Sequence, residues 1–277
     1  MTDSLLPPES PDDECSTATP YTDGELADRG LTREQLPRHV AFIMDGNGRW
    51  AEQQGQPRAV GHARGADTVE HLVEETARLG LEQITLYCFS QENWKRPEPE
   101  QAFLFDLLEQ YVVGQRERIA RQRLQFATIG EITRLPESVQ HEIEVTRQLS
   151  ETNRGMRLCL ALNYGARQEI SSAVREIVAA AKNDELSIDE IDDRTISRYL
   201  DTAGMPDPDL VVRTAGEMRL SNFLLWQLSY AEIWVTDEYW PDFREPHLHA
   251  ALRSFAQRER RFGAVKPLPQ SSATDVT

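Results

Sequence analysis

The sequence has few cysteines, no excess of basic charge and no long apolar run. Its three cysteines, Cys15, Cys88 and Cys159, lie far apart and are odd in number, so we expect no disulfide framework. Cys88 and Cys159 stand in apolar, strand-like runs and are predicted to be reduced core residues. The formal net charge of −16 argues against a nucleic-acid binder, which would carry a basic face.

Nothing in the sequence resembles a membrane or export signal. No apolar run approaches the roughly 20 residues that a membrane-spanning helix needs. The N-terminus lacks the basic start and apolar core of a secretory signal, so we expect a cytoplasmic protein. Residues 1–36 hold nine acids and two arginines, a local charge of −7, and several prolines. We therefore expect a disordered acidic leader over 1–36, and a flexible tail over 264–277.

Between these ends, residues 37–263 alternate between short apolar runs and longer segments with helical spacing. The predicted strands are 40–44, 83–89, 124–129, 156–162, 209–212 and 233–236. The predicted helices are 63–79, 100–121, 137–151, 168–181 and 245–261, with a polar surface connection over 182–194. This alternation predicts a single α/β domain with a mostly parallel central sheet flanked by helices. At 277 residues, 39% of them hydrophobic, the chain can bury such a core.

Three polar segments directly follow predicted strands: 45–50, 90–97 and 213–221. In parallel sheets, ligands bind in the crevice beyond the carboxyl ends of the strands. We therefore expect the three segments to converge on one site. Glu232 stands at the start of its predicted strand, so this rule alone does not assign it to that site.

The first of these segments reads DGNGRW. Its glycines allow the backbone to approach a ligand, and the carboxylate of Asp45 suits a magnesium ion. Arg49 and Arg58 carry guanidinium groups whose geometry matches phosphate. Taken alone, the tetrapeptide DGNG fits an ordinary tight turn better than a phosphate site. The two later segments favour a site for a Mg²⁺-bound phosphorylated ligand.

The later segments each have a simpler interpretation as well. Taken alone, SQENWKRP fits a polar loop with Trp94 packed over the core better than it fits a binding site. RTAGEMRLSN brings Arg213, Arg219 and Ser221 within nine positions, a set that would grip a diphosphate. The alternative is a pair of surface arginines neutralised by Glu217. His62, near a predicted helix start, could donate to a phosphate, although a lone histidine is more often packed or solvated.

Several segments of the sequence resemble the motifs of a known enzyme family. The segments HVAFIMDGNGRWA, GHARGA, TLYCFSQENWKRP, LALNYGAR, LVVRTAGEMRLSNFLLWQLSYAEIWVT, YWPDF and RERRFG resemble the motifs of the cis-prenyltransferase family, and of its bacterial members most closely. They occur in the family's order from about residue 39 to 263. Ala215, where the bacterial enzymes often carry glycine, and Val60, where bulkier residues are frequent, are small departures.

The resemblance implies an activity and a set of roles. The family extends an allylic diphosphate, typically farnesyl diphosphate, with isopentenyl diphosphate units and makes each new double bond cis. Asp45 matches the essential Mg²⁺-binding aspartate, Glu232 a second Mg²⁺ ligand, and Asn93 the residue assigned to proton removal. The matched substrate-binding positions are Gly46, Asn47, Gly48, Arg49, Trp50, Arg58, His62, Ser90, Gln91, Glu92, Trp94, Arg96, Arg213, Arg219, Leu220 and Ser221.

The resemblance also implies a homodimer in which RERRFG reaches the neighbouring subunit's site. The product would be a long polyprenyl diphosphate, the precursor of a lipid carrier for cell-wall glycans. We expect transient contact with the inner membrane face when it is released. A growing hydrocarbon needs apolar surroundings, because each buried CH₂ contributes ~0.8 kcal/mol. We therefore predict an apolar tunnel between sheet and helices, with segment 100–113 as its wall, although ordinary core packing explains that segment equally well.

Two other function classes remain open from the sequence. The first is a non-catalytic subunit of a heteromeric prenyltransferase. Such partners lose the metal aspartate and the phosphate-binding arginines, which this chain keeps. The second is a Mg²⁺-dependent phosphohydrolase, which the first polar segment alone would allow. A trans-type prenyl synthase is disfavoured because the chain has no DDxxD motif and its pattern is not all-helical.

Overall fold

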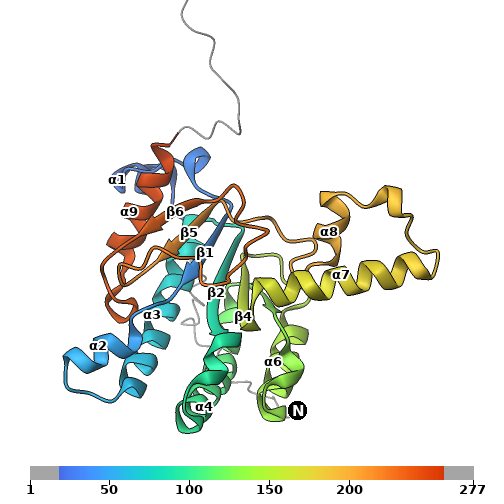
Figure 1. The fold of residues 1–277 in the computed structure, drawn as a ribbon. Helices are drawn as coiled ribbons and strands as arrows, with labels where there is room; N and C mark the ends of the chain where they lie inside the picture. The colour runs from blue at the N-terminus through green and yellow to red at the C-terminus, as the bar shows by residue number, and fades with distance from the viewer. Residues whose placement is uncertain (1–18, 259–277) are drawn as a thin grey trace, which may run out of the picture.

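The computed structural model describes residues 19–258. Within them, a six-stranded sheet has the order β3-β4-β2-β1-β5-β6, and every neighbouring pair is parallel. The strands are β1 (His39–Ile43), β2 (Gln83–Ser90), β3 (Gln125–Ile129), β4 (Arg157–Tyr164), β5 (Leu210–Arg213) and β6 (Glu232–Val235). The predicted single α/β domain with a parallel sheet is confirmed (Figure 1).

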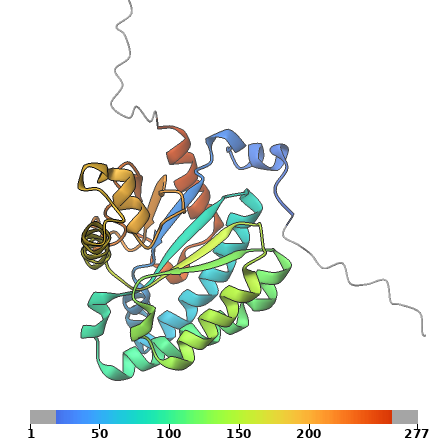
Figure 2. The ribbon, with the colours of Figure 1, turned by 90° about the vertical axis from the view of Figure 1, so that its right-hand side faces the viewer.

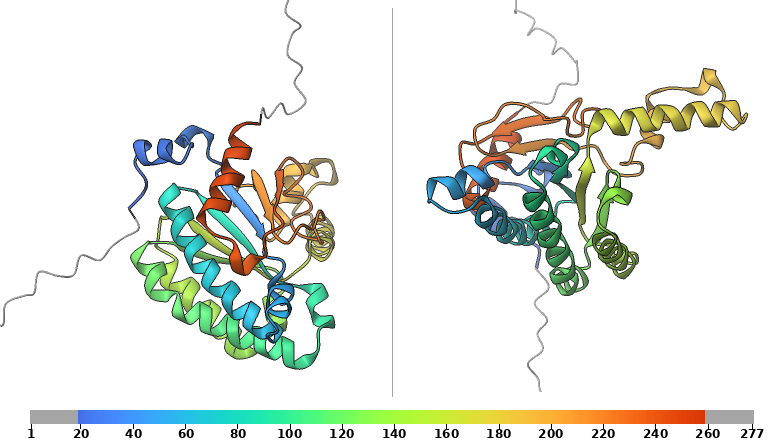
Figure 3. Two further views of the ribbon diagram at one scale, coloured as in Figure 1. Left: turned by 90° about the vertical axis from the view of Figure 1, so that its left-hand side faces the viewer. Right: turned by 60° about the horizontal axis from the view of Figure 1, so that its bottom comes forward.

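Helices cover the sheet and connect its strands. The helices are α1 (Asp23–Asp28), α2 (Asn47–Gln53), α3 (Arg58–Leu79), α4 (Glu98–Gly114), α5 (Arg116–Arg121), α6 (Glu137–Ser150), α7 (Ala166–Lys182), α8 (Asp193–Tyr199) and α9 (Glu245–Ala256). Figure 3 (left) shows α3, α4, α6 and α9 lying across one face of the sheet, and Figure 2 shows that layer from the other side. Helices α7 and α8 project away from the body as an arm (Figures 1 and 3).

The central strand β1 shows why the sheet has two buried faces. Val40 and Phe42 point into the larger apolar cluster, which the helical layer covers. Ala41 and Ile43 point to the other side, into a smaller cluster that includes Phe223. Because side chains alternate along a strand, a strand with both faces buried needs the continuous apolar run that this segment has.

Several predicted boundaries differ from the structure. The expected helix 100–121 is two helices, α4 and α5, which meet at Gln115. Helix α3 begins at Arg58 rather than residue 63, directly after Pro57, whose fixed φ suits a helix start. The connection 182–194 contains a short 3₁₀ turn (Ile188–Glu190) and leads directly into α8. The predicted final helix 245–261 ends at Ala256, and its last residues lie outside the described range.

The disordered leader predicted over 1–36 requires a correction. Residues 21–36 pack on the domain: Tyr21, Leu26 and Leu31 are buried in the larger core cluster, and Leu26 belongs to α1. The Tyr21 hydroxyl also donates a 2.8 Å hydrogen bond to Glu75 on α3. The acidic composition predicted disorder, but three well-spaced apolar residues are enough to dock this segment on the domain. Residues 1–18 and the predicted tail 264–277 lie outside the described residues.

Two smaller expectations concern cysteines and membrane spans. Cys88 and Cys159 are free thiols, Cys159 fully buried and Cys88 partly so, which confirms that they form no disulfide. Burial raises the pKa of both thiols to about 12, so neither is a reactive thiolate. Among residues 19–258, no helix combines the length and apolarity that crossing a bilayer requires.

Candidate active site

Asp45 lies two residues beyond β1 and is fixed by its backbone. Its amide donates to Thr214 Oγ1 at 2.9 Å, and that hydroxyl donates back to the Asp45 carbonyl at 2.7 Å. The carboxylate accepts from the Gly46 amide and from Arg213 Nη2, both at 2.8 Å. Burial alone would raise the pKa of Asp45, but the bond and charge of Arg213 outweigh it and hold the pKa below its usual value. The carboxylate is therefore ionised at neutral pH.

Arg213 ends β5, the strand beside β1, and its side chain is only 4% exposed. Besides Asp45, its guanidinium donates to Ser221 Oγ at 2.8 Å and to the Arg219 carbonyl. Its Nε is buried without a hydrogen-bond partner among the described residues. This buried cation thus joins the first and third polar segments, as the strand-end rule predicted.

Gly46 has a backbone φ of 99°, which only glycine adopts without strain. A Cβ at this position would lie 2.9 Å from the Ala215 Cβ, so the site also needs the missing side chain. The chain then enters α2 at Asn47, which means that DGNG starts a helix and is not a hairpin turn. Ala215 itself has a φ of 68°, a costly conformation for alanine.

Arg58 and Arg96 meet on a carboxylate that the sequence analysis missed. Glu100 Oε1 lies 2.9 Å from Arg96 Nη1, 3.6 Å from Arg58 Nε and 3.8 Å from His62 Nε2. The Arg58 guanidinium also packs against Gly48, whose missing Cβ leaves room for it. The only local sequence signal is the (i, i+4) spacing of Arg96 and Glu100 at the start of α4.

His62 is largely buried beside this cluster, and it is neutral at pH 7. Burial, with a contribution from the positive charge of Arg96, lowers its pKa to about 4. Arg96 Nη1 lies 3.4 Å from its Nε2. A neutral imidazole can donate one hydrogen bond to an anion without adding charge to the site.

Asn93 lies in the 3₁₀ turn Gln91–Lys95 directly after β2. Its Oδ1 accepts a 3.0 Å hydrogen bond from the Ser90 amide, which orients the side-chain amide. Trp94 turns the other way: its ring packs on Phe89 and Phe105, and its Nε1 donates to Asn163 at 2.7 Å. For Trp94, therefore, the interpretation as a core-packing residue fits better than contact with substrate.

Asn222 ties the ends of three strands together. Its Nδ2 donates to Glu92 at 3.1 Å and to Gln168 at 3.2 Å, and its Oδ1 accepts from the Arg167 amide at 2.9 Å. Ser221 and Asn222 both have positive φ values, 51° and 61°, and these side-chain bonds compensate for that strain. The turn that presents Ser221 to Arg213 is therefore rigidly held.

Arg49 and Arg219 share the carboxylate of Glu217. Arg49 Nη1 lies 3.2 Å from Glu217 Oε1, and Arg49 Nη2 lies 3.5 Å from Asp45 Oδ1. Arg219 is 60% exposed and pairs with the other Glu217 oxygen. The simpler interpretation that the sequence left open, an arginine neutralised at the surface by Glu217, thus describes Arg219 but not Arg213.

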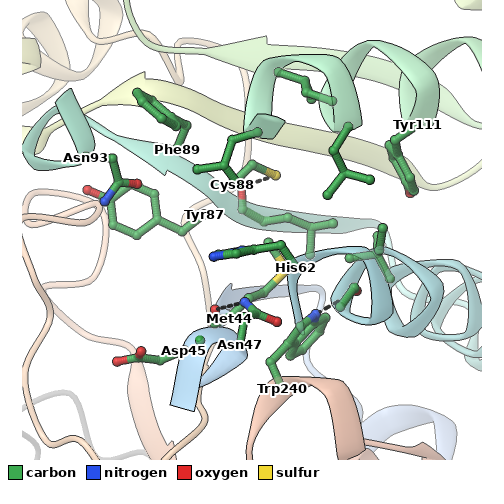
Figure 4. Close-up of a pocket in the computed structure, with 18 of the residues that line it drawn as sticks. Met44, Asp45, Asn47, His62, Tyr87, Cys88, Phe89, Asn93, Tyr111 and Trp240 are labelled. Carbon is green, nitrogen blue, oxygen red and sulfur yellow. Dashed lines mark hydrogen bonds between the residues drawn. The ribbon is translucent and has the colours of Figure 1, made fainter. Parts of the chain in front are cut away.

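A cavity of about 230 Å³ opens between the sheet and helices α2, α3 and α4 (Figure 4). Its polar end carries nine predicted site residues: Asp45, Gly46, Asn47, Gly48, Arg49, Arg58, His62, Asn93 and Arg96. The rest of its wall is mostly apolar: Val69, Leu86, Cys88, Phe89, Leu104, Phe105, Leu107, Leu108, Tyr111, Leu160 and Leu162. The 100–113 segment therefore serves both predicted purposes, since it lines the cavity and also buries Phe105 and Val112 in the core.

The remaining predicted site residues lie around or away from this cavity. Arg213 contacts it through Asp45, and Ser221 and the Arg219 carbonyl contact Arg213. Leu220 packs against the smaller core cluster, and Trp50 Nε1 donates to Asp242 at 2.7 Å. The predicted residues that do not line the cavity are Trp50, Ser90, Gln91, Glu92, Trp94, Arg213, Arg219, Leu220, Ser221 and Glu232.

Glu232 departs most clearly from expectation. It is the first residue of β6, and the strand register aligns it with Leu210 and, one strand further, with Val40. Asp45 lies five residues beyond Val40, roughly 16 Å along the strand direction. Glu232 instead pairs with Arg258. Within one chain, the two predicted metal ligands are therefore at opposite ends of the parallel strands, Asp45 at the carboxyl end and Glu232 at the amino end.

The donor set at Asp45 suits magnesium only in combination with a phosphorylated ligand. In the described part of the chain, no three His, Cys, Asp or Glu side chains are grouped so that they could hold a metal ion. Mg²⁺ commonly binds through one or two carboxylates plus substrate phosphates and water. A single ionised carboxylate with Arg49 and Arg213 beside it fits that mode and does not fit a closed structural site, and the same cavity also holds Arg58 and Arg96.

Comparisons with known proteins agree with this geometry. A family model described as putative undecaprenyl diphosphate synthase matches residues 43–263. An isoprenyl transferase of Rhodopirellula baltica is 48% identical over 235 residues, which cover 85% of this chain and 96% of that protein. One of Geobacter sulfurreducens is 44% identical and covers 84% and 95%.

Two solved structures share the fold. Lavandulyl diphosphate synthase from Lavandula x intermedia, in complex with dimethylallyl diphosphate, superposes with a TM-score of 0.81 at 38% identity and covers 83% of this chain and 99% of that one. A probable undecaprenyl diphosphate synthase from Campylobacter jejuni gives a TM-score of 0.68 at 30% identity and covers 82% and 98%.

Proposed function

The chain belongs to the undecaprenyl diphosphate synthase family of cis-prenyltransferases and transfers prenyl groups, and from this premise we propose that it adds isopentenyl diphosphate units to an allylic diphosphate to make a long polyprenyl diphosphate. The observation that best supports this proposal is the position of Asp45. Its ionised carboxylate is held by Arg213 at the polar end of a cavity whose other walls are mostly apolar. One end suits a diphosphate and the other a hydrocarbon.

The allylic diphosphate would bind with its charged group at the polar end. Arg49, Arg58 and Arg96 would donate charge-assisted hydrogen bonds to its oxygens, and neutral His62 one further bond. Glu100 occupies Arg58 and Arg96 in the described structure and keeps them oriented. Asp45 would hold Mg²⁺, which supplies charge neutralisation to the departing diphosphate. The bound dimethylallyl diphosphate of the lavender enzyme supports an allylic substrate, and farnesyl diphosphate is our proposed primer.

Isopentenyl diphosphate would bind on the Arg213 side of Asp45. Ser221 and Arg219 lie there, and Arg219 is exposed and free to turn from Glu217 to a phosphate. Holding both substrates around Asp45 would bring the alkene carbon toward the allylic carbon, which is the main requirement of the condensation. Asn93, oriented by the Ser90 amide, would position the proton that is lost, with a phosphate oxygen as the stronger base.

The experiment that tests this function uses the purified full-length protein. It is incubated with Mg²⁺, farnesyl diphosphate and labelled isopentenyl diphosphate, and the extracted lipids are sized. We expect labelled lipids longer than the primer, and their loss in Asp45→Asn but not in Asp67→Asn, a surface control on α3. Absence of chain growth with any divalent cation would overturn the proposal. Release of phosphate without growth would identify a phosphohydrolase, and growth only with a second protein would identify a heteromeric subunit.

We extend the proposal to a homodimer. Val174 and Val178 on the projecting helix α7 are about half exposed, at 50% and 46%, which suits an apolar face covered by a second copy. A metal-binding role for Glu232 would then require a site shared with the partner, because it cannot reach Asp45 of its own chain. The RERRFG segment begins at Arg258, and the rest of it, residues 259–263, lies outside the described residues. Light scattering of the purified protein should give twice the chain mass, and a monomer would refute the dimer.

We expect the long product to be released at the cytoplasmic face of the inner membrane. The support is chemical, because a hydrocarbon of many isoprene units is insoluble in water. Flotation with anionic vesicles, with and without substrates, tests this. Co-flotation that rises during turnover would support transient membrane contact, and no vesicle-bound protein or product would refute it.

A further inference from the structure

A second cavity lies at the opposite end of the strands from Asp45. It is a groove of about 600 Å³ at the amino ends of the parallel strands, and it shares no lining residue with the Asp45 cavity. Gln83, Gln125 and Arg157, the first residues of β2, β3 and β4, are paired in register and line it. Because residues in register point to the same face of a sheet, their side chains form one polar row.

Arg157 is held at the centre of this row. Its Nη1 donates to Gln83 Oε1 at 3.2 Å, and its Nη2 donates to Gln125 Oε1 at 3.4 Å. Gln83 is itself only 1% exposed, and its Nε2 donates to Thr85 Oγ1 at 3.2 Å, which fixes the amide that Arg157 contacts. Two neutral amides therefore orient the guanidinium without neutralising its charge.

The charge of Arg157 is not balanced in the part of the chain that the structure describes. Arg157 is partly buried, and it forms no ion pair with any described residue. Glu82 is the one carboxylate among the described residues that line the groove, and Arg38 donates to both of its oxygens at 2.8 Å. Arg154, on the exposed rim, donates only to two backbone carbonyls of its own loop. The groove therefore carries two uncompensated positive charges on a chain whose net charge is −16.

We propose that this groove binds a small organic phosphate, with the phosphate group on Arg157 and Arg154. A partly buried guanidinium without an anion is costly, and a phosphate offsets that cost through charge-assisted hydrogen bonds. An arginine has five N–H donors, and the two glutamines take one each, so three remain for phosphate oxygens. Two free positive charges also match the charge of a phosphate monoester, which is about −2 at neutral pH.

The size and the wall of the groove favour an organic phosphate over free phosphate. Small-molecule sites typically span about 300–1,000 Å³, and this groove lies in that range. Leu81, Leu124 and Met156 belong to its wall and offer apolar surface to the uncharged part of the ligand. The site goes beyond prenyl transfer, and its test measures binding and not turnover.

Isothermal titration calorimetry of the purified full-length protein, with EDTA and without Mg²⁺, measures the binding of phenyl phosphate and of inorganic phosphate. The polar end of the Asp45 cavity also suits phosphate, so the variants must separate the two sites. Arg157→Gln should weaken binding to the groove at least about tenfold, since it removes charge-assisted hydrogen bonds. Arg154→Gln, at an exposed position, should weaken it by about threefold. Arg58→Gln should affect only the Asp45 cavity.

The control is Arg147→Gln, which removes an exposed arginine of α6 that pairs with Glu144 and should leave both binding events as in the wild type. Amide hydrogen exchange locates the groove event, and phenyl phosphate should slow exchange at 122–125 and 154–157. Thermal unfolding shows which variants fold, and the exposed Arg154→Gln keeps the test open if Arg157→Gln does not.

Binding of wild-type strength in folded Arg157→Gln, or in Arg154→Gln if only that variant folds, would overturn the site. Protection from exchange that is confined to 45–58 would overturn it as well, because all binding would then belong to the Asp45 cavity. Inorganic phosphate that binds the groove as tightly as phenyl phosphate would overturn the assignment to an organic phosphate. None of these results bears on chain growth, so the proposed function stands or falls separately.

Discussion

Arg213 Nη2 and Asp45 Oδ2 are 2.8 Å apart, yet the two side chains are unequally buried: Arg213 is 4% exposed and Asp45 31%. The pair joins the end of β5 to the residue that follows β1, so it sits where two neighbouring strands deliver their polar segments. Because Arg213 is more deeply buried, it depends more on the charge of Asp45 than Asp45 depends on the charge of Arg213. The two halves of the pair should therefore respond differently to mutation.

We expect Arg213→Ala to lower the free energy of unfolding by about 2 kcal/mol, because the remaining carboxylate keeps some access to water. Asp45→Ala should cost more, about 3–5 kcal/mol, since it leaves a buried guanidinium without its anion. Urea titration followed by circular dichroism measures both. Arg147→Ala breaks an exposed pair with Glu144 and serves as the control, with an expected loss under about 1 kcal/mol. Equal losses from Arg147→Ala and Arg213→Ala would contradict the argument.

Asn93 and Asp45 should differ in their effect on turnover. The Asn93 carbonyl oxygen already accepts from the Ser90 amide, and an amide is a weak base, so we assign Asn93 to positioning. Asn93→Ala should lower kcat by about tenfold, below the range of true acid–base groups. Asp45→Ala should lower it by about a hundredfold to a thousandfold. Steady-state kinetics at saturating substrates would decide, and losses of similar size would make Asn93 the base itself.

His39 should make the fold sensitive to acid. Its Nδ1 lies 2.8 Å from the Pro206 carbonyl and its Nε2 2.8 Å from Thr85 Oγ1, an arrangement that suits the neutral ring. Burial, the dominant cause, lowers its pKa from 6.5 to about 4. Above pH 6.5 the ring is neutral in both states. As pH falls toward 4, the unfolded chain gains a proton that the folded chain does not, so stability falls.

From pH 7 to pH 5 this residue should remove about 2 kcal/mol of unfolding free energy. Urea titrations at both pH values measure the loss, and His39→Gln should reduce it. His141→Gln, on the exposed side of α6, is the matched control and should leave the pH dependence as it is in the wild type. If both variants lose the same stability as the wild type between the two pH values, His39 is not the source.

The N-terminal segment should contribute measurably to stability. Leu26 on α1 is 0% exposed, whereas Asp28 on the same short helix is exposed. Leu26→Ala should lower the unfolding free energy by about 2–4 kcal/mol, the usual cost of emptying a buried leucine site. Asp28→Ala should change it by less than about 0.5 kcal/mol. Thermal unfolding of both proteins tests this, and matching melting temperatures would show that the segment docks too weakly to matter.

Much of the site could be predicted because its residues directly follow strands that are recognisable in the sequence. Asp45 and Arg213 each stand at the end of an apolar run, which places both at the carboxyl edge of a parallel sheet. Glu100 could not be found in this way, because its neighbours Arg58 and His62 come from α3, far from it in sequence, and the residues next to it in the chain are ordinary. The burial of Tyr21 and Leu26 was not predicted, because the acidic residues around them made the segment look disordered. Glu232 was assigned by resemblance, and only the strand register shows how far it lies from Asp45.

Asn222 has a consequence for how this edge of the protein opens. Its side chain links residues that follow β2 and β4 to the turn that follows β5, so none of the three segments can detach alone without breaking the others' bonds. Amide hydrogen exchange at 91–93, 166–168 and 220–223 should therefore slow and quicken in concert, as one cooperative opening unit. Both substrates would then enter through a rim that fluctuates as a single body.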